Sequence, residues 1–482
     1  MYTLWSILIT LTYLLGIYLA VRVVMYDTQR LAQSTVAWAI SLVLIPWFAI
    51  PVFMLIGERK FVGYVKARRL DKMRLLNLAP GIWDARVRHK NARDESDGLS
   101  MRTMEKLSEL PVSNGNAVRF LVDGKESFDA MFSALERARE YILLQFYILR
   151  ADGVGRQLRD ILVRKALQGV RVHVLIDAVG SWGLENAYVE SLRDAGCAVA
   201  SFNVSEGRTN PMRINFRNHR KVVVIDGETG FTGGINVGDE YLGLDPEIGP
   251  WRDNFLRLRG PAVKALQLSF AEDWHWAGRE VLKLDWTASE AVPDATAGEV
   301  TARTLIVPSG PADVQDTKLL LYLYLINEAT RRLWIMSPYF VPGDEVMSAL
   351  QLAVMRGVDV RIYIPYRADH MLVWLSSFAF LQDPRLRGVR IYRYKAGFLH
   401  AKTVIVDDDI SLVGTANLDN RSFRINFEVS AVLRSEELNR RIAAQIVLDQ
   451  ENCVPATHED LSHRSFWFRL GIAIARLFSP LC

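Results

Sequence analysis

Cysteine is scarce in this sequence of 482 residues, and the three that occur form no pattern: Cys197, Cys453 and Cys482. An odd number of widely spaced cysteines does not suit a disulfide framework, and no Cys-x-x-Cys pair offers the usual spacing of a zinc site. The composition is 50% hydrophobic, which excludes a disordered or fibrous chain. These features favour a globular protein in a reducing cytoplasm.

Charged residues are missing from two long stretches near the N-terminus, residues 4–21 and 31–57. Each stretch is long enough to cross about 30 Å of hydrocarbon as a helix. A cleaved signal peptide is an alternative for the first stretch, but no basic residue precedes it and a longer apolar run follows. Pro46 and Pro51 can kink the second helix. We therefore predict a transmembrane hairpin over residues 1–57, with helices at about 4–24 and 33–56.

Basic charge is concentrated immediately after this hairpin. Residues 58–93 contain eleven Lys or Arg and three acidic residues, a net charge of +8 by difference, although the whole chain carries only +4. The remainder is mildly acidic, which does not favour nucleic-acid binding, whereas a basic run beside an apolar segment suits anionic lipids. We predict a basic linker over 58–115 and, from the positive-inside rule, a large C-terminal part facing the cytoplasm.

The rest of the chain contains an internal duplication. Apolar runs at 141–149 and 333–341 are each followed by a β-rich run that starts with Gly-Val, at Gly169 and Gly357. Helical segments at 128–140 and 318–332 precede these runs. This alternation predicts an α/β domain built twice, with two similar halves packed together and the active site between them. The predicted bounds are 116–290 for the first half and 300–460 for the second.

Each half contains the pattern His-x-Lys-x4-Asp, formed by two sets of residues in register at a spacing of 181: His219, Lys221 and Asp226, and His400, Lys402 and Asp407. Two chance matches in a duplicated context are rare. A His and a Lys two apart on a strand project from the same face. Two imidazoles and two ammonium groups suit a phosphodiester: the lysines offset its charge, one imidazole attacks phosphorus and the other protonates the leaving alkoxide.

Metal ions and cofactors are not needed for this chemistry, and none is predicted. Protonated lysines repel a divalent cation, and His-x-Lys is not a known ligand spacing. The aspartates Asp226 and Asp407 complete the catalytic motif, but their odd spacing from the histidines favours structural or electrostatic roles. Asp253 and Glu428 are better candidates for orienting the histidines as a triad acid does, although surface salt bridges are a serious alternative for both.

The C-terminal segment 461–482 mixes aromatic and aliphatic residues with Arg469 and Arg476. This pattern is typical of an amphipathic helix. Such a helix lies in a membrane interface or packs on the protein's own core, and the sequence favours neither arrangement.

The doubled motif, followed by Gly-Gly-Ile-Asn236 and Gly-Thr-Ala-Asn417, resembles the phospholipase D superfamily. With the N-terminal hairpin and the tract from Gly414 to Glu428, the chain is similar to bacterial cardiolipin synthases over nearly its whole length. The resemblance implies transfer between two phosphatidylglycerol molecules through a phosphatidyl-histidine, at a bacterial inner membrane, by a multi-pass protein whose catalytic region faces the cytoplasm. It also implies roles for particular residues: His219 as nucleophile, His400 as acid and then base, and Lys221, Lys402, Asn236 and Asn417 holding phosphate. Thr415, where many members have serine, keeps the hydroxyl and is predicted to be a further substrate-binding residue.

Three other functions remain open on the sequence. A hydrolytic phospholipase D, or a transferase with another acceptor such as a phosphatidylserine-type enzyme, needs the same motif, and spacing does not separate water from an alcohol. A nuclease of the superfamily is disfavoured by the hairpin and by the acidic balance beyond residue 93. A non-catalytic membrane scaffold would have no need for two intact motifs. The sequence does not define the oligomeric state.

Overall fold

The computed structural model describes residues 2–26, 32–56, 99–202, 217–456 and 465–477, apart from 279, 288–291, 293–294, 368–369 and 382. The basic run at 58–93 lies outside the described residues. The end of the predicted linker is not a linker, because it contains helix α6 (Leu99–Ser108) and the start of strand β1 (Ser113–Val122). The first half of the duplication therefore begins slightly before residue 116.

The two halves share one core order of strands and helices, and the second half contains further short elements. The first half comprises β1, α7 (Asp123–Glu136), β2 (Tyr141–Phe146), α8 (Gly153–Leu167), β3 (Arg171–Asp177), α9 (Asn186–Asp194), β4 (Ala198–Phe202), β5 (Val222–Ile225), β6 (Thr229–Gly233), a 3-10 turn (Asp239–Leu242), β7 (Trp251–Arg252), β8 (Asn254–Arg259) and α10 (Ala262–Gly278). The second comprises β9 (Val300–Ser309), α11 (Thr317–Glu328), β10 (Arg332–Met336), β11 (Phe340–Val341), α12 (Asp344–Met355), β12 (Asp359–Pro365), α13 (Met371–Leu381), a 3-10 turn (Pro384–Leu386), β13 (Arg390–Tyr394), β14 (Phe398–Leu399), β15 (Thr403–Val406), β16 (Ile410–Gly414), β17 (Leu418–Asp419), α14 (Asn420–Arg424), β18 (Glu428–Arg434), α15 (Glu436–Glu451) and β19 (Cys453–Pro455).

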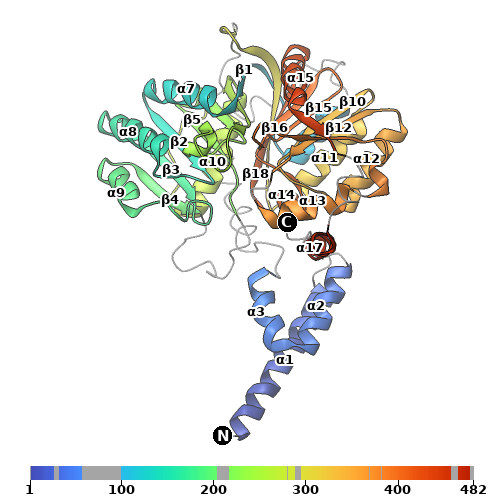
Figure 1. Cartoon of the computed structure of the whole chain (residues 1–482). Helices are drawn as coiled ribbons and strands as arrows, with labels where there is room; N and C mark the ends of the chain where they lie inside the picture. Colours follow the sequence, from blue (N-terminus) through green and yellow to red (C-terminus); the bar gives the residue numbers. More distant parts are fainter. Residues whose placement is uncertain are drawn as a thin grey trace.

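One sheet runs through both halves in the order β19-β13-β12-β10-β15-β16-β18-β9-β1-β8-β6-β5-β2-β3-β4. The halves join where β1 pairs antiparallel with β9, with Val118 opposite Val300. Figure 1 shows the resulting two lobes, each with helices packed on its part of the sheet. The predicted fold, two similar α/β halves packed together, is confirmed.

Burial explains why the apolar runs become strands. All six residues of β2 are buried, as expected for a strand covered by helices on both faces. β2, β3 and β4 are parallel neighbours joined by helices, and so are β10, β12 and β13 in the second half. The parallel strands place their carboxyl ends, and the loops that follow them, on one edge of the sheet.

The N-terminal segment forms three helices instead of two. Helix α1 (Tyr2–Tyr26) packs against α2 (Ala32–Leu44), which agrees with the predicted hairpin. The prediction of one continuous helix over 33–56 is wrong. Helix α2 ends at Leu44, and a separate helix, α3 (Pro46–Ile56), follows. Proline has no N–H for the helical hydrogen bond and its ring clashes with the preceding turn.

Helix α3 folds back on α2. The ring centroids of Trp38 and Phe53 are 5.1 Å apart, whereas fifteen residues of straight helix would separate them by about 22 Å. The bend packs closely on α1, where a Cβ at Gly16 would lie 2.3 Å from the Leu42 carbonyl oxygen. Among the described helices, α1 alone is long and apolar enough to cross a membrane, over Leu4–Met25.

Helix α17 (Phe466–Leu477) docks on α13 and also exposes apolar side chains. Ile472 packs with Phe378, and the Ser376 hydroxyl donates to the Ala475 carbonyl at 2.9 Å. Phe466 and Trp467 on the same helix are 70% and 76% exposed. The helix thus covers part of the protein and presents a second apolar surface.

Arg220, inside the first motif, ties the two halves together. Its side chain is fully buried and forms two 2.9 Å hydrogen bonds with Asp273 of α10. Its other nitrogens donate to the carbonyls of Glu428 and Ser309, which belong to the second half. A buried charge is tolerated only when it is paired in this way.

The substitution Asp273→Ala should destabilise the protein strongly, because it leaves the Arg220 guanidinium buried without its carboxylate. Loss of one partner of a buried pair costs about 3–5 kcal/mol. We expect a clear decrease in the midpoint of thermal unfolding in detergent. Asp129→Ala, which breaks the exposed Lys125–Asp129 pair, is the control and should change the midpoint little. Equal effects of the two substitutions would contradict the importance of the buried Arg220–Asp273 pair.

Candidate active site

The two motif histidines lie just before their strands, on segments that pair with the opposite half. The His219 N–H donates to the Phe427 carbonyl at 2.9 Å, and the His400 N–H donates to the Arg252 carbonyl at 2.8 Å. The prediction that His and Lys lie on the strand is therefore wrong in detail, since β5 and β15 begin after the lysines. Pairing across the halves determines where the imidazoles lie.

Each imidazole contacts a carboxylate from the other half. His219 Nδ1 lies 3.0 Å from Glu428 Oε2, and His400 Nδ1 lies 2.6 Å from Asp253 Oδ2. Both carboxylates are completely buried, so neither is part of a surface salt bridge. A Nδ1–H donated to a carboxylate leaves Nε2 of a neutral imidazole with its lone pair free.

The motif lysines are buried beside the histidines. The ammonium group of Lys221 donates to the His219 carbonyl at 2.8 Å, and that of Lys402 donates to the His400 carbonyl. The Lys221 nitrogen also lies 5.4 Å from the centre of the Tyr147 ring. The two motifs are close enough for Lys402 to act electrostatically on His219 and for Lys221 to act on His400. The structure thus brings both histidines and both lysines into one buried cluster.

The electrostatics of this cluster favour neutral imidazoles. Burial lowers the pKa of His219 to about 4, against the opposing effect of Glu428. Burial, together with Lys402 and Lys221, holds the pKa of His400 well below its usual range. Burial also lowers the pKa of Lys221 well below its usual range. An anionic phosphate placed here would offset the positive charge and favour the protonated forms.

The two carboxylates differ in charge state despite their similar positions. Burial raises the pKa of Asp253 to about 6, although Lys402 acts against it. Burial acts in the same direction on Glu428, but His219 and the Thr415 hydroxyl help to outweigh it and lower the pKa to about 2. Glu428 is therefore firmly ionised at neutral pH, whereas Asp253 titrates close to it.

Thr415 explains part of this difference. Its hydroxyl donates to Glu428 Oε2 at 2.5 Å and accepts from the Val429 N–H at 3.0 Å. The equivalent position in the first half is Gly234, where an added Cβ would lie 2.0 Å from Asp253 Oδ1. The Thr415 side chain is buried against Glu428, so the structure does not place it as the substrate-binding residue that the sequence predicted.

The motif aspartates lie away from the imidazoles. Asp226 and Asp407 follow the four-residue strands β5 and β15, five residues or about 16 Å beyond the lysines. Asp226 accepts backbone N–H groups of residues 139–141, and Asp407 those of residues 330–332. Both have positive φ angles, 53° and 48°. Their inclusion among the catalytic residues is not supported by this geometry, which agrees with the structural role that their odd spacing favoured.

The two asparagines, predicted to hold phosphate, are in different states. Asn236 is engaged on both sides, because its Oδ1 accepts from the Ile148 N–H at 3.1 Å and its Nδ2 donates to the Tyr241 hydroxyl at 2.7 Å. The buried Oδ1 of Asn417 has no hydrogen-bond partner among the described residues. The Asn417 amide is thus the better placed of the two to bind a ligand.

Aromatic residues that the sequence did not single out complete the site. The ring centroids of Tyr147 and His219 are 4.9 Å apart. The ring centroids of Trp251 and Tyr241 lie 5.0 and 6.5 Å from that of His400. Trp251 could have been noticed as the neighbour of Arg252-Asp253, and Tyr147 as the residue directly after β2. No periodic pattern distinguishes either from a core aromatic residue.

The described part of the chain contains no group of three His, Cys, Asp or Glu side chains suited to hold a metal ion. What the site offers is two neutral imidazoles, each hydrogen-bonded to a carboxylate, with two lysines beside them. Such a site can transfer a phosphoryl-type group through a histidine. The fold and the site together define a two-histidine enzyme of the phospholipase D type.

Comparison with known proteins identifies the family. Residues 131–274 and 322–448 match the family described as cardiolipin synthase, PLD-like domain. The chain is 45% identical over 477 residues to cardiolipin synthase A of Pseudomonas putida (strain W619), covering 98% of this chain and 97% of that protein. It is 44% identical over 470 residues to cardiolipin synthase A of Pseudomonas aeruginosa (strain LESB58), and this match covers 97% of this chain and 94% of that protein. This chain belongs to the cardiolipin synthase family.

A solved structure supports the fold. The phosphatidylserine synthase of Haemophilus influenzae Rd KW20 superposes with a TM-score of 0.59 and 15% identity, covering 80% of this chain and all of that one. At this identity the similarity concerns the arrangement of the two halves.

The substitution Thr415→Val should slow catalysis, because Glu428 loses a hydrogen bond that holds it against His219. Loss of one hydrogen bond to a charged group costs about 1.5–3 kcal/mol, or about 10- to 150-fold in rate if it is all lost in the transition state. Thr415→Ser keeps the hydroxyl and should remain close to the unchanged protein. Steady-state rates of both variants test this role. If the valine variant is as active as the serine variant, the hydroxyl does not support catalysis.

Proposed function

We propose that this protein forms cardiolipin and glycerol from two phosphatidylglycerol molecules. The buried pairing of His219 with Glu428 and of His400 with Asp253 is the observation that carries the proposal, because it prepares two imidazoles for one phosphodiester. Family membership, and the printed names of the relatives, indicate phosphatidyl transfer between membrane lipids.

In the first step, His219 Nε2 attacks phosphorus and the bond between phosphorus and the glycerol oxygen breaks. His400, protonated while the anionic substrate is bound, donates its proton to the glycerol alkoxide. In the second step, His400 takes a proton from a glycerol hydroxyl of another phosphatidylglycerol. This oxygen attacks phosphorus, the phosphorus–nitrogen bond breaks, and cardiolipin is released.

The difference between the carboxylates supports His219 as the nucleophile. The ionised Glu428 accepts the Nδ1–H of His219, which increases electron density at Nε2 and stabilises the positive charge that forms on attack. Asp253 has a pKa of about 6 and interacts less strongly with a cation. The protonated form of His400 is therefore less stabilised and gives up its proton more readily to the leaving oxygen, as a general acid must. We infer that Lys221 and Lys402 offset the charge of the phosphate oxygens, and that Asn417 Oδ1 accepts a hydrogen bond from a substrate hydroxyl.

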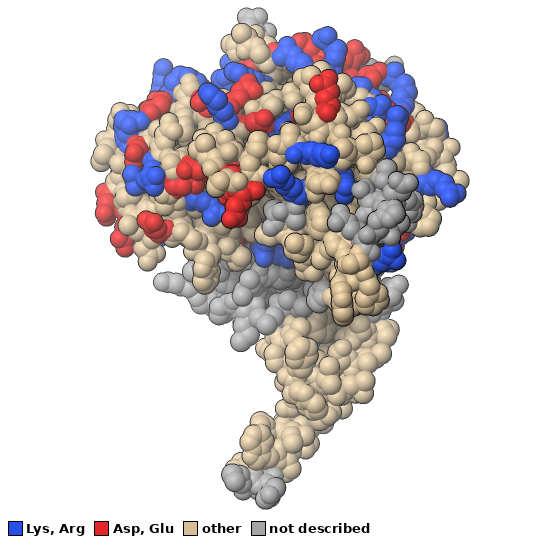
Figure 2. Space-filling model, viewed as in Figure 1, with Lys and Arg blue, Asp and Glu red and all other residues tan. Residues whose placement is uncertain are grey.

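The membrane part is consistent with a lipid substrate. Figure 2 shows charged side chains over the α/β part and none on the visible face of the stem formed by α1–α3. Arg22 lies near the end of α1, Arg30 follows it, and residues 58–93 contain eleven Lys or Arg against three acidic residues. By the positive-inside rule the catalytic region faces the cytoplasm of a bacterial inner membrane.

Helices α2 and α3 are about 20 and 16 Å long, and each is too short to cross the membrane. We therefore propose one crossing by α1 and a re-entrant α2–α3 pair, in place of a two-crossing arrangement.

Purified protein incubated with phosphatidylglycerol alone should yield cardiolipin and glycerol in equal amounts, measured by mass spectrometry. His219→Ala and His400→Ala should each abolish the reaction, because each removes one of two indispensable groups. Phosphatidic acid as the main product would support a hydrolase, and no turnover would support a scaffold. EDTA should leave the rate unchanged. Substantial activity in either alanine variant would refute the two-histidine mechanism.

An epitope tag at the N-terminus tests the proposed topology. In spheroplasts treated with external protease we expect the tag to be removed while the catalytic region stays intact, because α1 alone crosses the membrane. A detergent-permeabilised sample, in which both are digested, is the control. Protection of the tag would favour two crossings. Digestion of the catalytic region in intact spheroplasts would contradict its cytoplasmic orientation.

A further inference from the structure

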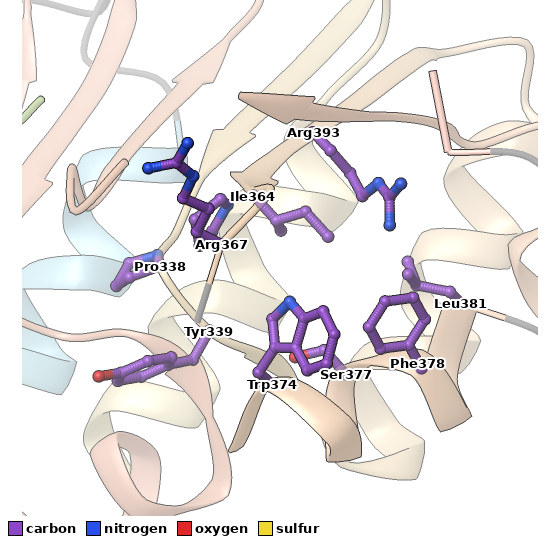
Figure 3. Close-up of a pocket in the computed structure, with 10 residues that line it drawn as sticks. Pro338, Tyr339, Ile364, Arg367, Trp374, Ser377, Phe378, Leu381 and Arg393 are labelled. Atoms are coloured by element: carbon purple, nitrogen blue, oxygen red, sulfur yellow. The ribbon is translucent and has the colours of Figure 1, made fainter. Parts of the chain in front are cut away.

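The second half contains a pocket between α13 and the ends of strands β12 and β13, which we call the α13 pocket (Figure 3). It is open to solvent, and the space inside it together with its open mouth amounts to about 350 Å³. Its main lining residues are Ile364, Arg367, Trp374, Ser377, Phe378 and Arg393. None of the catalytic histidines and lysines lines it.

The α13 pocket combines apolar walls with two guanidinium groups. Figure 3 shows Arg367 and Arg393 on the strand side, across from Trp374 and Phe378 of α13. Arg393 is nearly buried and its guanidinium lies 4.5 Å from the centre of the Tyr366 ring, whereas Arg367 is exposed. Arginine binds phosphate well and apolar walls bind a hydrocarbon chain, so the lining suits an amphipathic anion.

Comparison of the two halves indicates that this feature is specific to the second. Helix α9 occupies the corresponding place in the first half, after β3, and includes Glu190, Arg193 and Asp194. Helix α13, after β12, contains no charged residue in its eleven positions. Since the halves otherwise share one fold, packing alone does not require an uncharged helix here.

The outer surface beside the α13 pocket is apolar. Met371 of α13 is 63% exposed, and Phe466 and Trp467 of the adjoining α17 are also exposed. Helices α13 and α17 lie on the side of the α/β part that faces α1–α3 in Figure 1. An exposed apolar surface on the side of a membrane anchor fits contact with the bilayer.

The α13 pocket is linked by hydrogen bonds to the segment that contains Asn417. Tyr339 lines it, and the Tyr339 carbonyl accepts from the Ser337 hydroxyl at 2.7 Å. The same hydroxyl oxygen accepts from the N–H of Leu418 at 2.9 Å, and Leu418 directly follows Asn417. Two hydrogen bonds of Ser337 thus link Tyr339, in the lining of the α13 pocket, to the residue after Asn417.

We propose that the α13 pocket binds one acyl chain of an anionic phospholipid that enters from the bilayer, with Arg367 beside its phosphate. This site in the second half would hold the acceptor lipid, whose own phosphate does not react. The inference rests on the proposed function for the identity of the lipid, phosphatidylglycerol. Binding itself does not depend on turnover, which allows the two to be tested separately.

Fluorescence quenching tests binding. Phosphatidylglycerol with brominated acyl chains is added to the full chain and to its Trp374→Phe variant in detergent, and the difference between them reports Trp374. We expect that difference to be quenched, and more strongly than by brominated phosphatidylcholine at the same concentration. An unquenched Trp374 would overturn the proposal whether or not cardiolipin forms, and equal quenching by both lipids would overturn the role of the arginines.

Kinetics test the role in transfer. Leu381→Trp fills the α13 pocket, and Arg367→Glu repels phosphate at its mouth. Both should raise the KM for long-chain phosphatidylglycerol about tenfold, the size expected for losing one apolar or charge-assisted contact. Dihexanoyl phosphatidylglycerol should be used equally well by the Leu381→Trp variant and the unchanged protein.

Arg387→Glu is the matched control for Arg367→Glu, because Arg387 is exposed on the same half and does not line the pocket. It should leave the KM unchanged. An unchanged KM in both pocket variants, in an enzyme that makes cardiolipin, would overturn the inference alone. Absence of cardiolipin from the unchanged protein would instead overturn the proposed function.

Discussion

The site depends on one constraint: each catalytic histidine receives its carboxylate from the other half of the chain. His219 faces Glu428, and His400 faces Asp253, because the segments before β5 and β15 pair with segments of the opposite half. Neither half alone contains an oriented imidazole. The continuous sheet through β1 and β9 therefore has a direct chemical consequence, since it fixes both pairs at once. The buried Arg220 adds a second connection at the same junction.

The two halves share a fold but not an electrostatic environment. Glu428 with Thr415 forms an ionised, hydrogen-bonded partner for one histidine, whereas Asp253 beside Gly234 has no equivalent hydroxyl. A transfer reaction needs two different roles, one group that bonds to phosphorus and one that exchanges protons. Small differences between duplicated positions can supply them, because buried charges interact strongly in a medium of low dielectric constant.

Much of the fold was readable from the sequence, because buried parallel strands leave continuous apolar runs and duplication repeats them. The motif also revealed His219, His400 and their lysines. The exchange of carboxylates between halves could not be derived, since it depends on how two segments pair in space and not on spacing along the chain. The break of the second apolar helix had a visible cause in Pro46, but Phe53 meeting Trp38 is a packing outcome. Thr415 matched a family position, yet its hydroxyl is used by Glu428.

The chemistry requires a motif from each half, whereas contact with a membrane requires an apolar surface on one side of the protein only. A phosphodiester needs both motifs, but a lipid in a bilayer reaches them from one side only. Helices α13 and α17 of the second half expose apolar side chains, while α9 in the first half carries charged residues. The asymmetry of the surface thus parallels that of the catalytic cluster. A duplicated fold can keep its symmetry in the sheet, where packing requires it, and lose it where substrate approaches, because exposed positions contribute little to stability.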